Sequence, residues 1–231
     1  MLSRRLMLIV PFSALLPASA SADDARSVIA GAEALATRFR GNPQWGGIWN
    51  LIGACQAVLL APRIRGGGLI VAGQSGDGLV LARHGAVWSD PVGVAMSELS
   101  VGFQAGAREV GIAVCILSKP ALARLVQGGI SGGGSGGFSL GSLGVGAQAG
   151  GSSGQGIETL AVSVSEGGLY AGSGLGGMKV SASAALNAAL HGATQRPEAA
   201  LDVPGGRVAG AASLREVLAG ATRASFGFTP R

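Results

Sequence analysis

The sequence predicts an α+β fold, in which an antiparallel, glycine-rich β-sheet or partial barrel is flanked by helices. Short apolar segments, separated by glycine, proline and Asp-Gly turn signals, run through the middle of the chain, which is typical of antiparallel strands. Apolar residues recur at helical spacing near both ends of the chain. With 48% apolar and only 13% charged residues, the chain can bury a substantial core instead of remaining disordered.

The first predicted helix covers residues 23–40. Asp23 or Asp24 can cap its start, and Gly41, followed by Asn42-Pro43, ends it. The apolar residues at helical spacing are Val28, Ile29, Ala32, Leu35 and Ala36.

The predicted strands follow. Segments 69–72 and 79–83 flank a glycine-rich stretch in which Asp77-Gly78 predicts a hairpin turn. His84-Gly85 predicts a second turn, and Asp90-Pro91 predicts a break. The other predicted strands are 87–88, 99–105, 111–117, 160–165 and 169–171.

The C-terminal part predicts a short helix over 120–127 and a strand followed by a helix over 180–190, ending at His191-Gly192. Residues 194–208 resemble a polar linker. Ser213 and Glu216 have the spacing of a capping box, which predicts a terminal helix up to Arg223. The last residues, 226–231, are expected to fray.

Residues 1–22 have the pattern of an export signal. Arg4-Arg5 precede an apolar run over 6–16 and a small-residue segment. Cleavage is expected between Ala22 and Asp23. The apolar run is shorter than the about 20 residues that a membrane-spanning helix needs. The Arg-Arg pair resembles a twin-arginine signal, although it also occurs in ordinary signals. We therefore expect a periplasmic protein.

Cys55 and Cys115 are the two cysteines of the chain. Export permits a disulfide between them, but both lie in apolar runs, which fits two buried free thiols equally well. Two cysteines and two distant histidines predict no zinc site.

The formal net charge is +5, and arginine supplies every basic residue except Lys119 and Lys179. Arginine suits carboxylate and phosphate groups, because its planar guanidinium can donate two parallel hydrogen bonds. The arginines are scattered and are not interleaved with aromatic residues, so no nucleic-acid partner is expected.

No motif predicts catalysis, a cofactor or a metal. Residues 172–177 satisfy the glycine spacing of a dinucleotide loop, but the linker 194–208 offers no second apolar strand for a βαβ unit. The serines of the 128–156 tract match a nucleophile motif only by composition. Neither His84 nor His191 has a carboxylate nearby in the sequence at a spacing typical of a catalytic pair. Each is therefore expected to be structural or exposed.

Several motifs, in a consistent order, resemble the SYLF domain family, also called the Ysc84 actin-binding domain family. The resemblance extends over about residues 26–192. The motifs are Ala57-Val58-Leu59-Leu60-Ala61-Pro62, Gly76-Asp77-Gly78, Trp88-Ser89-Asp90-Pro91, Val101-Gly102-Phe103-Gln104-Ala105-Gly106, Leu140-Gly141, Gly168-Leu169-Tyr170-Ala171-Gly172 and Asn187-Ala188-Ala189-Leu190-His191-Gly192.

The resemblance implies a non-catalytic lipid-binding module. Eukaryotic members are associated with phosphoinositide membranes and actin, and bacterial members resemble exported phospholipid-binding proteins of the cell envelope. The expected organisation is a signal over 1–22, a lipid-binding domain over 23–192, and a linker, short helix and tail over 193–231. Residues 162–177 then become a strand pair joined by a glycine turn.

The expected ligand is a phospholipid or a membrane surface, held by arginines that meet phosphates and by an apolar groove for acyl chains. Trp45 and Trp49 either cover an edge of the core or lie at a membrane surface. The candidate lipid-binding residues are Arg38, Arg40, Trp45, Trp49, Arg63, Arg65 and Tyr170. The alternatives are an envelope scaffold that binds proteins through sheet edges or the glycine-rich loop, and a less favoured hydrolase.

Overall fold

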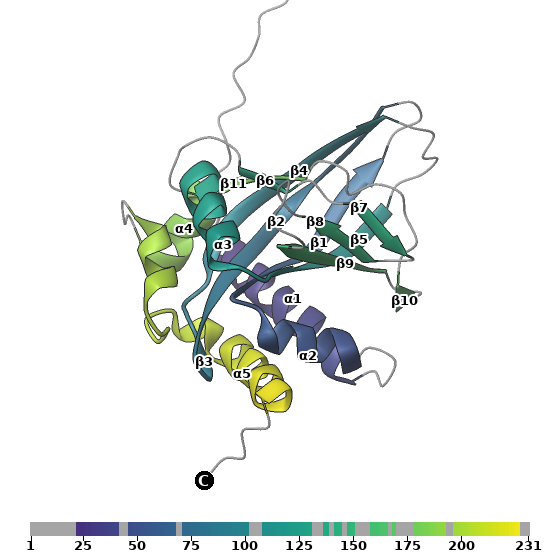
Figure 1. The fold of residues 1–231 in the computed structure, drawn as a ribbon. Coiled ribbons are helices and arrows are strands. Elements are labelled where there is room, and N and C mark those ends of the chain that lie inside the picture. The colour runs from purple at the N-terminus through teal and green to yellow at the C-terminus, as the bar shows by residue number, and fades with distance from the viewer. Residues whose placement is uncertain are drawn as a thin grey trace, which may run out of the picture.

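The computed structural model describes residues 22–41, 46–67, 71–101, 108–130, 136–138, 141–144, 147–150, 158–165, 168–169, 178–192 and 196–226. Trp45, Tyr170 and the export signal up to residue 21 lie outside the described residues. The described part has one extended antiparallel sheet with helices against both of its faces (Figure 1). This arrangement confirms the predicted α+β class.

The sheet has the strand order β6-β11-β4-β2-β1-β5-β9-β8-β7, with β3 paired to β2 and β10 paired to β9. Each pairing is antiparallel. In the described part of the chain, the end strands β6 and β7 are not paired to each other, so the sheet is open. The strands are β1 Ala57–Gly67, β2 Val71–His84, β3 Val87–Trp88, β4 Val92–Val101, β5 Arg108–Ile116, β6 Gly136–Phe138, β7 Gly141–Gly144, β8 Ala147–Gly150, β9 Thr159–Ser165, β10 Gly168–Leu169 and β11 Met178–Ala182.

The helices divide between the two sides of the sheet. One side carries α1, α2 and α5, and α3 lies on the other (Figure 1). The α-helices are α1 Ala22–Gly41, α2 Gly46–Ala54, α3 Lys119–Leu125, α4 Ala184–His191 and α5 Ala212–Phe226. A π-helical turn, η2 Val126–Ile130, and two 3-10 turns, η3 Pro197–Asp202 and η4 Ala209–Ala211, complete the described elements.

Strands β1 and β5 at the centre of the sheet are apolar on both faces. Val58 and Leu60 belong to the core under α1, α2 and α5, whereas Leu59 and Ala61 belong to the core on the side of α3. A strand that is covered on both faces has no polar face, so its sequence is continuously apolar instead of alternating. This explains why the run 57–61 carries no period-2 pattern.

Ser118 and Ser183 begin two of the helices. The Ser118 hydroxyl accepts from the Ala121 amide at the start of α3, and the Ser183 hydroxyl accepts from the Leu186 amide at the start of α4. Each satisfies an amide that has no partner within its own helix. Gly192, with φ of 71°, ends α4 in a conformation that side chains disfavour. The strand and helix predicted over 180–190 are confirmed.

The predicted hairpin at Asp77-Gly78 is wrong, because β2 passes through this stretch as one strand of 14 residues. Both neighbours, β1 and β4, supply backbone partners along it. Its glycines have another role: β1 shifts register between Leu60 and Arg65, and a Cβ on Gly76 would lie 2.3 Å from the Arg63 carbonyl oxygen. The glycine therefore admits the close backbone of β1.

The segment after Gly192 is integrated into the core. In the predicted linker, Leu201 and Val208 are buried, and Leu214, Leu218 and Ala221 of α5 belong to the core shared with α1 and α2. The capping-box expectation for Ser213 is wrong, because α5 already begins at Ala212 and the Ser213 hydroxyl donates to Glu33 of α1 at 2.6 Å.

The strands predicted over 87–88, 111–117 and 160–165 correspond to β3, β5 and β9. The strand predicted over 99–105 begins too late, because β4 already starts at Val92, and residues 102–105 lie outside the described residues. Strands β9 and β10 pair as Ser165 with Gly168 and Val164 with Leu169, which is the predicted strand pair over this region. The turn at Gly85, with φ of 62°, joins β2 to β3. The Asp90-Pro91 break separates β3 from β4.

Candidate functional site

A pocket of about 470 Å³ lies where the end of α1 meets α2 and α5. Its size is within the range of small-molecule sites in proteins. Its walls combine two arginines, one carboxylate, one tryptophan and small residues. The lining residues are Arg40, Trp49, Ser213, Glu216, Val217, Gly220, Arg223 and Ala224.

Arg40 reaches the pocket from the last turn of α1. It is exposed, while its neighbour Phe39 is fully buried in the core and fixes the end of the helix. A cation is favoured at this position, because the carbonyl end of a helix carries partial negative charge. Among the described residues, Arg40 has no ion-pair partner, so its guanidinium is available to an anion.

Trp49 forms the apolar wall of the pocket. Its side chain is 8% exposed and belongs to the core under α1, α2 and α5. The structure therefore supports the prediction that this tryptophan covers an edge of the core, and the same residue also faces the pocket. A buried aromatic wall is rigid, so this side of the pocket is fixed by the core.

Glu216 and Arg223 face each other across two turns of α5, with Arg223 Nη2 2.5 Å from Glu216 Oε1. The two side chains are 71% and 34% exposed, respectively. Gly220 lies between them on the same helix, and a Cβ there would be 3.8 Å from Arg223 Nη2 and 3.9 Å from Trp49 Cζ2. The missing side chain keeps this part of the pocket open.

The structure brings together only some of the predicted lipid-binding residues. Arg40 and Trp49 line the same pocket. Arg38 is exposed on α1 but is not part of the lining. Arg63 and Arg65 are exposed on β1, away from this lining.

The sequence prediction missed the contribution of α5. Glu216, Gly220 and Arg223 recur at four- and three-residue spacing and therefore share one helix face. This period is visible in the sequence, but it does not distinguish a terminal appendage from a helix of the core. Its burial against α1 and α2 depends on tertiary packing, which periodicity alone does not reveal.

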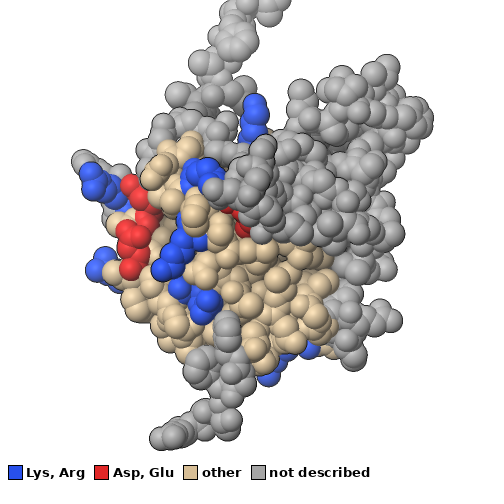
Figure 2. Space-filling model, viewed as in Figure 1, with Lys and Arg blue, Asp and Glu red and all other residues tan. Residues whose placement is uncertain are grey.

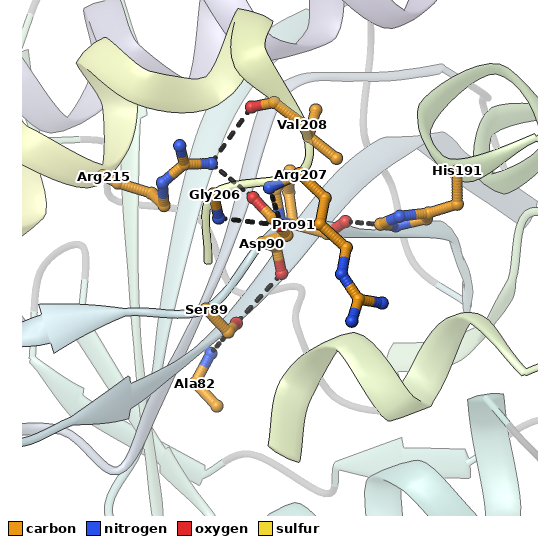
Figure 3. Close-up of polar contacts among 9 residues, drawn as sticks. All are labelled: Ala82, Ser89, Asp90, Pro91, His191, Gly206, Arg207, Val208 and Arg215. Atoms are coloured by element: carbon orange, nitrogen blue, oxygen red, sulfur yellow. Dashed lines mark hydrogen bonds and ion pairs between the residues drawn. The ribbon is translucent and has the colours of Figure 1, made fainter. Parts of the chain in front are cut away.

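A second polar centre surrounds Asp90 between β3 and β4 (Figure 3). Asp90 Oδ2 accepts hydrogen bonds from the amides of Gly206 and Arg207, at 3.0 and 2.8 Å, and Oδ1 accepts from Arg215 of α5. Burial by itself raises the pKa of the Asp90 carboxyl, but the amides of Gly206 and Arg207 and the Arg215 charge outweigh it, so the pKa lies below its usual value. Asp90 therefore accepts from two backbone amides and ties the strands to α5.

Both histidines contact backbone carbonyls. His84 Nε2 lies 2.9 Å from the Leu201 carbonyl oxygen, and His191 Nε2 lies 2.8 Å from the Pro91 carbonyl oxygen (Figure 3). A protonated Nε2 donates in each contact, which uses the nitrogen in holding loops together. This geometry agrees with the expected structural role.

Cys55 and Cys115 are free thiols buried in one core cluster. The Cys55 thiol donates to the Leu51 carbonyl at 3.0 Å. Burial raises the pKa of the Cys55 thiol strongly, and a hydrogen bond with Cys115 raises it further. Of the two alternatives left open by the sequence, the structure contains the free thiols.

Within the described ranges, no helix is both long and apolar enough to cross a bilayer. The same ranges contain no group of three or more His, Cys, Asp or Glu residues placed to hold a metal ion. Figure 2 shows Lys and Arg side chains running down the face where α3 lies, with acidic side chains gathered beside them near α4. Charges of both signs therefore lie close together on this face, and Arg124 of α3 pairs with Glu158 at 2.5 Å.

The structure is thus a mixed α+β domain with a pocket lined by two arginines, a glutamate and a tryptophan. Residues 97–221 match the model of the Ysc84 family, described as "Las17-binding protein actin regulator". This match spans more than half of the 231 residues, and the chain belongs to the Ysc84 (SYLF) family. Comparison with curated proteins found no match. Comparison with solved structures also found none.

Proposed function

We propose that this protein is an exported, non-catalytic phospholipid-binding protein of the bacterial cell envelope, acting in the periplasm at a membrane surface. The observation that carries the proposal is the meeting of Arg40, Arg223 and Trp49 around one pocket. Guanidinium groups bind phosphate oxygens through charge-assisted, bidentate hydrogen bonds. The indole supplies the apolar wall that the start of the acyl chains or the glycerol requires.

The export signal predicted over residues 1–22 supports the location. Removal of Arg4 and Arg5 with that signal lowers the formal net charge from +5 to +3, which still favours association with anionic membranes. The basic side chains over α3 (Figure 2) add positive charge outside the pocket. Salt screens this long-range attraction between the protein and an anionic membrane. We therefore expect added salt to weaken the first association with the membrane more than binding in the pocket.

Flotation of the purified protein with lipid vesicles tests the proposal. Binding is expected at low salt, and Arg40→Ala is expected to weaken it about tenfold, because one charge-assisted hydrogen-bonding group is lost. Arg26→Ala is the matched control: it removes an exposed arginine from the other end of α1, where it pairs with Asp23. Failure to bind any vesicle at low salt would refute the proposed function.

A scaffold that binds envelope proteins is a second candidate, because the description of the family names a protein ligand and an actin regulator. Affinity purification from membranes distinguishes the two. Specific protein partners recovered without co-purified lipid favour the scaffold. Phospholipid recovered with the wild type, but not with Arg40→Ala, favours lipid binding.

A further inference from the structure

The charges around the pocket are not of one sign. Glu216 places a carboxylate beside the two arginines and holds Arg223 at 2.5 Å. The charge of Glu216 has the same sign as a phosphate, so this carboxylate opposes the binding of a purely anionic ligand beside it. At 71% exposure, Glu216 also contributes little to the core. Glu216 is the one carboxylate among the described residues that line the pocket, and it can meet a positively charged group of a ligand.

A ligand that carries one negative and one positive charge can pair with the two arginines and with Glu216 at the same time. A phosphate between Arg40 and Arg223 leaves an ammonium, a few bonds away, next to Glu216. In that arrangement, each charge of the ligand has a neighbour of opposite sign, and the existing pair between Arg223 and Glu216 is supplemented instead of broken. Complementary charge of this kind gives specificity more than raw affinity.

We propose that the pocket selects phospholipids whose headgroup joins a phosphate to a primary ammonium, as in phosphatidylethanolamine, and that Glu216 determines this selection. The inference rests on the proposed function, because it names the headgroup that the same pocket binds. A primary ammonium carries three N–H donors that can bond to a carboxylate. A quaternary ammonium, as in phosphatidylcholine, has none, and phosphatidylglycerol has no positive charge to offer.

Gly220 gives the space for this headgroup. A Cβ at this position makes only ordinary contacts, at 3.8 Å to Arg223 Nη2 and 3.9 Å to Trp49 Cζ2. A side chain at this position therefore starts beside Arg223 and Trp49, which both line the pocket. Leucine is also a strong helix former, so Gly220→Leu fills the cavity while α5 remains intact.

The test compares vesicles of phosphatidylcholine alone with vesicles in which part of that lipid is replaced by phosphatidylethanolamine or by phosphatidylglycerol. Wild type, Glu216→Gln, Gly220→Leu and the control Arg26→Ala are measured at physiological salt. Circular dichroism confirms that each variant is folded. Gly220→Leu has a filled pocket, so any vesicle binding that it retains comes from charges outside the pocket. This residual binding is subtracted from the binding of the other variants.

The wild type is expected to bind phosphatidylethanolamine vesicles at least about fivefold more tightly than either of the others. Glu216→Gln should lose this preference and gain affinity for phosphatidylglycerol, while Arg26→Ala keeps the wild-type order. Soluble glycerophosphoethanolamine should compete, and inorganic phosphate should compete less. Equal competition by both would identify a simple phosphate site and would overturn the selection.

Loss of headgroup selection and loss of phospholipid binding give different results in these measurements. Wild-type binding to phosphatidylglycerol that equals binding to phosphatidylethanolamine, with a ratio unchanged in Glu216→Gln, overturns the headgroup selection and leaves phospholipid binding intact. Absence of binding to every vesicle, at low salt as well as at physiological salt, overturns both.

Discussion

Gly53 of α2 lies against the backbone of Ala221 in α5 so closely that a Cβ on Gly53 would be 2.1 Å from the Ala221 carbonyl oxygen. The two helices therefore approach each other at a point where only glycine fits. Because α2 supplies Trp49 to the pocket and α5 supplies Glu216 and Arg223, this contact also sets the distance between the pocket walls.

Replacement of Gly53 with alanine is expected to destabilise the protein by about 2 to 3 kcal/mol, since the added methyl group forces the two helices apart. Urea denaturation measures the change. Gly220→Ala is the control on the same helix pair: its methyl group finds room and a helical alanine is more favourable than glycine by about 1 kcal/mol. Equal stability of Gly53→Ala and wild type would show that the helices are not in this close contact.

Removal of the Asp90 carboxylate should also be costly. Asp90→Ala leaves Arg215, 15% exposed, without its ion-pair partner, and leaves the amides of Gly206 and Arg207 without their acceptor. We expect a loss of about 3 kcal/mol, as for other buried pairs from which one partner is removed. Thermal unfolding provides the measurement. Glu216→Ala, which breaks the exposed pair with Arg223, should cost far less; similar losses for the two variants would contradict the buried role of Asp90.

Stability should decrease in acid because of Asp90. Its pKa is lowered in the folded protein, so its contribution is complete above the unfolded value near 3.8 and is lost as the pH falls through the folded pKa. Asp90→Asn should therefore unfold with a smaller dependence on pH below about 4 than the wild type does.

Asp77 acts in the opposite direction, because burial and the nearby charge of Asp24 raise its pKa. The charged Asp77 carboxylate destabilises the folded protein at high pH. This destabilisation disappears as the pH falls through the folded pKa and the carboxyl becomes protonated. The comparison of Asp77→Asn with Asp90→Asn separates the two effects in the same melting experiment. Identical pH profiles for the two variants would contradict the assignment of opposite shifts.

The thiols of Cys55 and Cys115 should be unreactive in the folded state. Both are buried, and the raised pKa of Cys55 keeps it protonated, whereas the thiolate is the reactive form. Iodoacetamide followed by intact-mass measurement should add no label to the native protein and two labels after denaturation. A chain that takes no label after denaturation without reductant would instead contain a disulfide.

The elements that the sequence predicted well have local signals. The helix of α1 was expected over 23–40 and spans Ala22–Gly41, because its apolar stripe and its terminal residues agree. The turn signal at Asp77-Gly78 failed because the register shift in β1 brings the Arg63 carbonyl against Gly76. The sequence alone does not distinguish a glycine that makes room for a neighbouring strand from a glycine that forms a turn.

The candidate site was predicted only in part for a related reason. Arg40 and Trp49 were selected because they lie close together in the sequence, and they do share a pocket. Arg223 comes from a helix more than 170 residues further along the chain, and only the packing of Leu214 and Leu218 into the core brings it there. Local periodicity identifies a helix face, but not the surface against which it packs.

The involvement of α5 in the core has a consequence for the order of folding. The first described helices, α1 and α2, pack against the last one, and Trp88 donates its indole N–H to Thr222 of α5 at 3.1 Å. Contacts of such high sequence separation cannot form until the final residues are synthesised, and they fold slowly. The core that α1, α2 and α5 share is therefore completed only after α5 has been synthesised.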